Sequence, residues 1–300
     1  MTYDLRLTTN MQRNRYLYHA MAGITTVIWG TTMVASKVLL NEGLSPAQIM
    51  FDRFLLGYVF LWILYPRTHR IRSLHDEALF AGMGVFGGSL YFLTENSALI
   101  YAQATDVSLI CASVPLISAI LSHFVLGERL SRGFRLGSAV AMAGVALVIL
   151  NGNFVLKMNP LGDILAFAAI CCWAVYCLLV KKLRHNYSAL FITRRLFLYG
   201  ILTLLPYFLY EPFHFSITAL QRPAVWGNLL FLGLIASSLC YVMWNSAIRE
   251  LGIVKTNSYL YFSPAITIVT ASIVLSEHVT AFILLGTALI LLGLWIAEKR

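Results

Sequence analysis

Residues 89–130 read SLYFLTENSALIYAQATDVSLICASVPLISAILSHFVLGERL, and residues 238–279 read SLCYVMWNSAIRELGIVKTNSYLYFSPAITIVTASIVLSEHV. The second stretch repeats the first at an offset of 149 residues. Without gaps, the match covers 89–150 and 238–299 and holds 14 identical residues in 62 positions. The identities include Asn, Pro and Glu, which are scarce in so apolar a chain and therefore indicate an internal duplication. A weaker match at an offset of 144 places Trp29 on Trp173 and Lys37 on Lys181.

The composition is that of a membrane protein. Of the 300 residues, 59% are hydrophobic and 12% are charged, against about 45–50% apolar and about 25% charged residues in soluble domains. A soluble globule of this size cannot bury so much apolar surface, so part of the surface must face lipid. The five cysteines lie in apolar runs without the spacing of metal ligands. We therefore expect no metal site and no cofactor.

The apolar runs predict an all-α polytopic fold. A spanning helix needs ~20 mostly apolar residues, and runs of this length are too continuous for the strands of a barrel. The first run follows a polar, basic segment and is read as a retained helix rather than a signal peptide. Ten spans are predicted: 20–40, 46–65, 77–99, 105–126, 134–151, 161–180, 190–210, 224–247, 256–275 and 281–297.

The basic residues predict the orientation. With the N-terminus in the cytoplasm, 16 of the 22 Lys and Arg residues fall in inside segments, and only Lys157 and Arg222 fall in outside loops. Cytoplasmic loops of membrane proteins carry such an excess of Lys and Arg. The net charge of +9 is thereby explained by orientation in the membrane, and no nucleic acid partner is expected. The sequence predicts a multi-pass protein of the cell (inner) membrane with both termini in the cytoplasm and 1–19 as a cytoplasmic segment.

The duplication divides the spans equally between 20–151 and 161–298. Each half holds five spans, and five is odd, so the second half should enter the membrane in the opposite orientation. Inverted repeats of this kind are typical of secondary transporters.

The repeated motifs resemble those of the EamA-type permeases of the drug/metabolite transporter superfamily. The resemblance rests on 96–99, Pro115, 126–130, Gly137 and Gly144, and in the second half on 244–247, Pro264, 276–278 and Gly286. It covers about residues 20–298 and implies two EamA-like repeats around a central cavity. It also implies alternating access, with a small-molecule substrate such as an amino acid or another amphipathic solute. The expected energy source is a proton gradient or exchange, and export is the expected direction.

The candidate substrate cavity centres on Glu95, a carboxylate inside a predicted span. Ionisable groups inside membrane spans are costly and are by default functional candidates. Glu95 lies one helical turn after Tyr91 and shares its face, so it either binds substrate or protons or pairs with Lys37 or Arg53. The repeat places Trp244 at the position of Glu95, which predicts an asymmetric site. The predicted cavity residues are Trp29, Tyr91, Glu95, Asn96, Trp173, Trp244 and Tyr261; Asn96 alternatively bonds a neighbouring helix.

A second set of residues is predicted to shape the helices. Pro115 and Pro264 remove a hydrogen bond from their helices and act as hinges or as tolerated kinks. Glu128 and Glu277 end two spans and serve a structural or a gating role. Gly137 and Gly144, like Gly286 and Gly293, are seven residues apart on one face and predict close helix packing.

Three other functions are compatible with this pattern. A flippase for lipids or lipid-linked sugars would share the helix count and the duplication. An intramembrane enzyme would need a converging nucleophile and base, and the motifs of common hydrolases and nucleotide-binding loops are absent from the sequence. A receptor or sensor would bind the same solutes without moving them.

Overall fold

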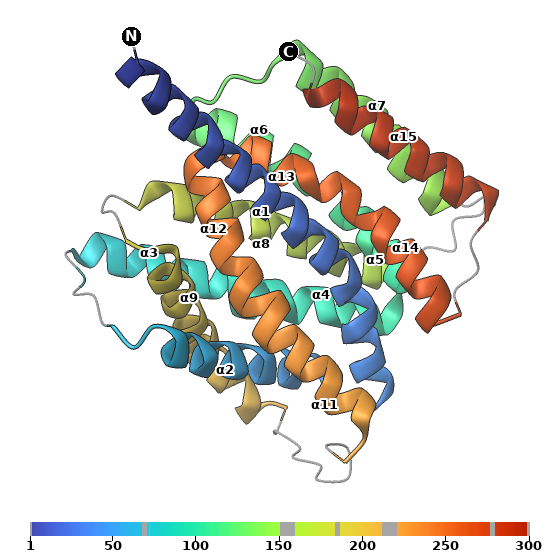
Figure 1. Ribbon diagram of the computed structural model, residues 1–300. Coiled ribbons are helices and arrows are strands. Elements are labelled where there is room, and N and C mark those ends of the chain that lie inside the picture. Colours follow the sequence, from blue (N-terminus) through green and yellow to red (C-terminus); the bar gives the residue numbers. More distant parts are fainter. Residues whose placement is uncertain are drawn as a thin grey trace.

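The computed structural model describes residues 2–67, 71, 73–150, 160–183, 187–211, 221–276 and 280–298. Every regular element in these ranges is a helix (Figure 1). Several helices begin at the breakers in the sequence. For example, Pro46 is the first residue of its helix, and the Ser45 side chain accepts a hydrogen bond from the Gln48 amide at 3.2 Å, which satisfies one of the free N–H groups of the first turn.

The helices of the first half are α1 (Thr2–Asn41), α2 (Pro46–Leu64), α3 (Leu74–Gly84), η1 (Val85–Ser89), α4 (Leu90–Tyr101), α5 (Ala104–Cys111), α6 (Val114–Leu126) and α7 (Arg132–Leu150). Those of the second half are α8 (Pro160–Lys182), α9 (Ala189–Leu204), η2 (Leu205–Leu209), α11 (Pro223–Leu230), η3 (Phe231–Leu239), α12 (Cys240–Leu251), α13 (Ile253–Ser258), η4 (Tyr259–Phe262), α14 (Ser263–Val274) and α15 (Ala281–Glu298). Both η1 and η3 are π-helical, and the offset of 149 residues aligns them. π-Helical turns inside α-helices are often found at functional sites.

Seven helical segments in the described ranges are long and apolar enough to cross a membrane. The other three of the ten predicted spans correspond to α7, to α13–η4–α14 and to α15. In α15, the stretch Ala281–Ala297 is apolar but shorter than the seven segments. The chain is therefore a multi-pass α-helical membrane protein. The seven are Arg15–Asn41, Pro46–Leu64, Leu74–Tyr101, Ala104–Leu126, Pro160–Lys182, Ala189–Leu209 and Pro223–Leu251.

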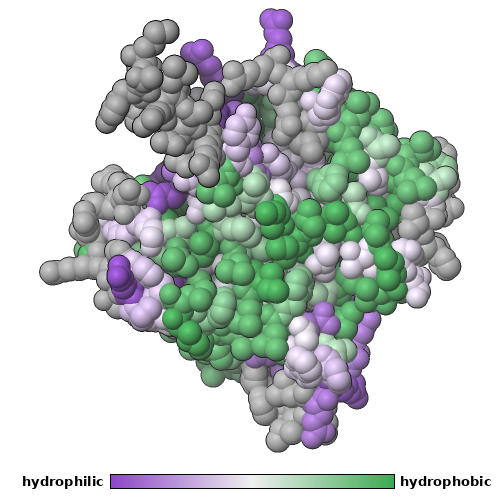
Figure 2. Space-filling view, viewed as in Figure 1, coloured by the Kyte–Doolittle hydropathy of each residue, from purple (hydrophilic) through white to green (hydrophobic). Residues whose placement is uncertain are grey.

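The surface agrees with a lipid environment. Large apolar side chains are exposed, among them Ile63 (74%), Phe124 (80%) and Ile273 (77%). In the view of Figure 2, apolar residues cover the middle and the right of the molecule, and hydrophilic residues gather at its upper left and left edge and at its lower end. An apolar belt with polar ends matches the hydrocarbon core and the two interfaces of a bilayer.

The two halves pack against each other through corresponding helices. α1 packs on α12 and α14 of the second half, and α8 packs on α4 and α6 of the first. These contacts bury the core between the halves. The helices therefore interlock rather than forming two separate bundles.

The last helices of the two halves, α7 and α15, lie side by side (Figure 1). A Cβ atom added at Gly137 would lie 2.3 Å from the carbonyl oxygen of Gly293, and one added at Gly144 would lie 2.6 Å from that of Gly286. The prediction that these glycines form close-packing faces is confirmed. Because Gly137 meets Gly293 and Gly144 meets Gly286, the two helices run antiparallel.

Candidate functional site

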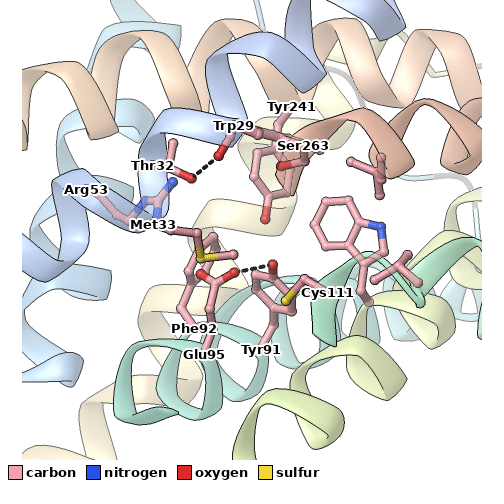
Figure 3. A pocket seen from close by; sticks show the side chains of 13 residues that line it. Trp29, Thr32, Met33, Arg53, Tyr91, Phe92, Glu95, Cys111, Tyr241 and Ser263 are labelled. Atoms are coloured by element: carbon pink, nitrogen blue, oxygen red, sulfur yellow. Dashed lines mark hydrogen bonds between the residues drawn. The ribbon is translucent and has the colours of Figure 1, made fainter. Parts of the chain in front are cut away.

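A cavity of about 50 Å³ lies between the two halves. Substrate pockets for small molecules usually measure about 300–1,000 Å³, so this conformation is closed around the centre and has room only for water-sized molecules. Figure 3 shows side chains from both halves pointing toward one another there. The lining residues are Trp29, Thr32, Met33, Arg53, Tyr91, Phe92, Glu95, Cys111, Val114, Trp173, Tyr241, Leu260 and Ser263.

The cavity wall is built from residues that the duplication aligns. At the offset of 144 residues, Trp29 corresponds to Trp173. At the offset of 149, three further pairs of lining residues correspond: Phe92 with Tyr241, Cys111 with Leu260, and Val114 with Ser263. A cavity lined by such pairs lies where the two repeats meet.

One wall of the cavity carries both charged side chains. Glu95 (4% exposed) accepts a hydrogen bond from the Tyr91 hydroxyl group, one turn earlier on α4. Arg53 (2% exposed) comes from α2; its Nε donates to the Ser237 hydroxyl oxygen at 2.9 Å, and its guanidinium lies 4.1 Å from the centre of the Phe92 ring. Both line one cavity of low polarity, where opposite charges attract each other more strongly than they do in water. Such a pair offers opposite charges to a dipolar solute.

Aromatic rings form a large part of the remaining wall. The ring centroids of Trp29 and Trp173 lie 5.1 Å apart in an edge-on arrangement, and those of Tyr91 and Trp173 lie 5.2 Å apart. Tyr241 contacts Trp29 with centroids 5.5 Å apart. Rings at these distances stabilise each other and present apolar faces to a solute.

The π-helical segments hold two of these rings in place. The Trp29 indole donates to the carbonyl oxygen of Ala236 in η3 at 2.8 Å, and the Tyr241 hydroxyl donates to that of Gly87 in η1 at 2.9 Å. Gly87 and Ala236 are aligned by the offset of 149 residues. A carbonyl at the same place in each half therefore positions a ring of the cavity.

Two interrupted helices complete the site. Pro115 and Pro264 each stand second in α6 and α14, and the continuous helix is broken just before them. In the first half, Ala112 and Ser113 separate α5 from α6; in the second, the 3-10 turn η4 separates α13 from α14. Residues beside both breaks line the cavity. Discontinuous helices at the centre of the membrane are found in many secondary transporters.

The structure brings together four of the seven residues predicted for the cavity: Trp29, Tyr91, Glu95 and Trp173. Trp244 is fully buried and lies behind the wall, with its ring centroid 4.9 Å from that of Trp29. In the described part of the chain, Asn96 and Tyr261 are not among the lining residues.

Asn96 and Tyr261 contact neighbouring helices instead. The Asn96 side-chain amide donates to the carbonyl oxygen of Pro46 at 3.3 Å, which is the alternative role expected from its position. The Tyr261 hydroxyl lies 3.2 Å from the hydroxyl of Ser138 in α7. Glu128 lines a separate cleft beside residues 16–19 of α1, and Glu277 lies outside the described residues.

Sequence reasoning missed Tyr241 and treated Arg53 only as a partner for other charges. The duplication could have identified Tyr241, because it aligns with Phe92, which lies one residue after Tyr91. Arg53 is a charged residue inside a predicted span and was named as a possible partner of Glu95, but it was not included among the predicted cavity residues. Its side chain reaches the centre through contacts with Ser237 and Phe92, which are far from it along the chain.

Comparisons with known proteins agree with this architecture. The chain is 27% identical to an uncharacterized transporter of Archaeoglobus fulgidus over 94% of this chain and 97% of that one. It is 28% identical, over 92% of each chain, to a protein of Streptantibioticus cattleyicolor named a "probable terminal-alkyne amino-acid exporter". One solved crystal structure superposes with a TM-score of 0.72 at 18% identity, covering 94% of this chain and 98% of that one, and so shares the fold.

The model of the EamA-like transporter family matches residues 17–150 and again residues 160–298. The two matches together cover most of the chain and correspond to its two halves. The protein is therefore a member of the EamA-like transporter family.

Proposed function

We propose that this protein is a secondary active transporter that exports small amphipathic metabolites, such as amino acids, through the central cavity. The observation that carries the proposal is the cavity wall: residues aligned by the duplication surround one buried guanidinium, Arg53, and one carboxylate, Glu95. Buried charges inside a membrane protein mark substrate or ion pathways. The aromatic rings beside them suit the apolar part of an amphipathic solute.

The proposed mechanism is alternating access between two inverted repeats, 20–151 and 161–298, each with five spans. The antiparallel packing of α7 on α15 supports the inversion, because these two helices are equivalent in the repeat. Transport requires the closed centre to open toward each side in turn. The breaks beside Pro115 and Pro264 are the points where the helices are expected to bend.

The proposed topology has ten spans, with residues 1–19 and both termini in the cytoplasm of a cell whose inner membrane holds the protein. The beginning of α1 and the end of α15 lie on the same side of the molecule in Figure 1, which supports an even number of spans. Reporter fusions after Asn41, Arg72, Gln103 and Arg132 should report outside, inside, outside and inside. Two adjacent loops on the same side would contradict the count.

The substrate is tested by counterflow. Proteoliposomes containing the purified protein are loaded with a pooled library of amino acids and metabolites, and exchange of each labelled solute is compared with protein-free vesicles. We expect exchange of a subset of zwitterionic, amphipathic solutes. Ligand binding without exchange would indicate a receptor, and movement of labelled lipid between leaflets without solute exchange would indicate a flippase.

Energy coupling is proposed to involve protons or exchange. The Glu95 carboxyl group, bonded to the Tyr91 hydroxyl, is the group in the cavity that can take up and release a proton. An imposed pH gradient should therefore drive accumulation of the substrate identified by counterflow. Accumulation that responds only to a second solute on the other side would instead indicate an exchanger.

A further inference from the structure

A charged cleft of about 840 Å³ opens beside residues 16–19 of α1. Its wall includes Tyr16 and His19 on α1, Glu128 and Arg129 after α6, and Lys255 on α13. Arg129 and Lys255 are exposed. The cationic groups outnumber the carboxylate, so the cleft is suited to an anion.

An apolar groove of about 640 Å³ follows the same helix, along Gly23, Ile24, Val27 and Ile28. Its other wall is formed by Tyr259 and Phe262 of η4. Ile24 is 53% exposed and Val27 is 46% exposed. Apolar side chains on the outer surface of a membrane-spanning helix face lipid, so the groove opens toward the hydrocarbon core.

The cleft and the groove meet at Tyr259, which lines both. Its hydroxyl lies 2.8 Å from His19 Nδ1. From Tyr16 to Ile28 a helix rises by about 18 Å, at ~1.5 Å per residue. One leaflet contributes about 15 Å of hydrocarbon, half of the ~30 Å core. The site therefore has the length and the order of polarity of one lipid molecule in one leaflet.

We propose that an anionic phospholipid binds here, with its phosphate at Arg129 and Lys255 and one acyl chain in the groove beside Gly23. The charge of the cleft selects an anionic headgroup over a zwitterionic one. The continuous apolar groove favours a lipid over a free phosphate ion, which would gain nothing from it. Tyr259 lines the groove, and the next residue, Leu260, lines the central cavity. The bound lipid therefore stabilises η4, and occupancy of the lipid site affects the transport rate.

The experiment compares lipid retention by native mass spectrometry after purification from vesicles of mixed phosphatidylglycerol and phosphatidylcholine. Wild-type protein should retain phosphatidylglycerol in preference. Gly23→Leu fills the groove, since an added Cβ lies 3.9 Å from the Tyr259 ring, and should abolish retention. Gly227→Leu is the matched control, because an added Cβ meets nothing within 4 Å there; it should retain lipid as the wild type does.

The headgroup contacts are tested by the double variant Arg129→Gln/Lys255→Gln. It should lower phosphatidylglycerol affinity roughly 30-fold, since each basic residue near an anionic headgroup contributes about a factor of five. This variant leaves the groove unchanged and so tests the site even if Gly23→Leu fails to fold. Equal retention of both lipids by the wild type would overturn the proposal. The proposal would also be overturned if inorganic phosphate displaced the lipid and the Gly23→Leu variant bound phosphate as the wild type does. The site would then be one for a free anion.

Discussion

In the first half of the chain, the Lys37 ammonium donates to the carbonyl oxygens of Leu99 and Ala102 at the end of α4. In the second half, Lys181 donates to the carbonyl oxygen of Arg249 near the end of α12, at 3.0 Å. The two lysines correspond at the offset of 144 residues. Each satisfies carbonyl groups that a helix end leaves unpaired, so the same side chain performs the same structural role in both halves.

The same two helices differ where they reach the cavity. α4 carries Tyr91 and Glu95, and the aligned positions on α12 are Cys240 and Trp244. The first half thus contributes a hydrogen-bonded carboxyl group, and the second contributes an indole that packs behind the aromatic wall. The two halves therefore share the features that set the helix geometry, namely the π-helical segments, the helix breaks and the lysines at the helix ends. The side chains at the centre have diverged and give a site with one polar and one apolar side.

The largest effect is expected from removing the charge that sets the halves apart. Glu95→Gln should abolish concentrative transport while the protein still folds and inserts, because the amide keeps the size of the side chain but cannot take up and release a proton. The measurement is substrate accumulation in proteoliposomes over a range of imposed pH gradients. Glu250→Gln, an exposed carboxylate on α12, is the matched control and should transport normally. Normal accumulation by Glu95→Gln at every pH would show that the carboxylate is only structural.

The second prediction tests the close packing of α7 on α15, to which both halves contribute a glycine face. Gly293→Val should destabilise the fold by about 1–3 kcal/mol or prevent assembly, because an added Cβ lies 2.5 Å from both the Gly137 carbonyl oxygen and the Ala141 amide. The measurement is thermal unfolding in detergent, followed by tryptophan fluorescence. Gly227→Val provides the control at an open glycine. Equal melting temperatures for the two variants would mean that α7 and α15 do not pack closely in the membrane.

A third prediction concerns the apolar side of the site. Trp244→Ala should weaken substrate binding by about 1–3 kcal/mol through lost apolar and stacking area, because Trp29, which the indole supports, lines the cavity. It should leave the pH dependence of transport unchanged, in contrast to Glu95→Gln. Binding isotherms on the folded fraction, at several pH values, separate the two effects. A shifted pH profile in Trp244→Ala would remove the proposed division between a polar and an apolar half.

The sequence predicted the arrangement of the helices better than the direction in which individual side chains point. The breaks before Pro115 and Pro264, the glycine faces and the mid-span Glu95 all follow from residues that are unusual in an apolar helix. Tyr261 was predicted to line the cavity because it is an aromatic residue in a helix that lines the central cavity of the family the sequence resembles. Leu260 and Ser263, which are three residues apart and so share a helix face, line the cavity, whereas the hydroxyl of Tyr261 lies against Ser138 of α7. Which face of this helix turns toward the cavity is decided by its contacts with neighbouring helices, here with α7, and the residue types alone do not specify it.

The smallest expected effect compares two asparagines that the duplication aligns, Asn96 and Asn245. Both are fully buried. Asn245 accepts from the Tyr176 hydroxyl at 2.6 Å and donates to the Thr193 hydroxyl oxygen at 3.0 Å. Asn96 donates to the Pro46 carbonyl oxygen at 3.3 Å, and its own side-chain oxygen has no partner among the described residues. An unsatisfied buried oxygen offsets part of what the single bond contributes.

Asn245→Ala should therefore cost about 1–3 kcal/mol, because it leaves two buried hydroxyl groups with one partner fewer, whereas Asn96→Ala should cost about 1 kcal/mol or less. The measurement is the melting temperature of each variant in the same detergent. Trp244→Ala serves as a reference for a larger loss, since deleting a buried indole usually costs about 3–5 kcal/mol of stability. Equal losses for the two asparagines would mean that the Asn96 oxygen has a partner in the bilayer-embedded protein. The halves would then be equivalent at this position.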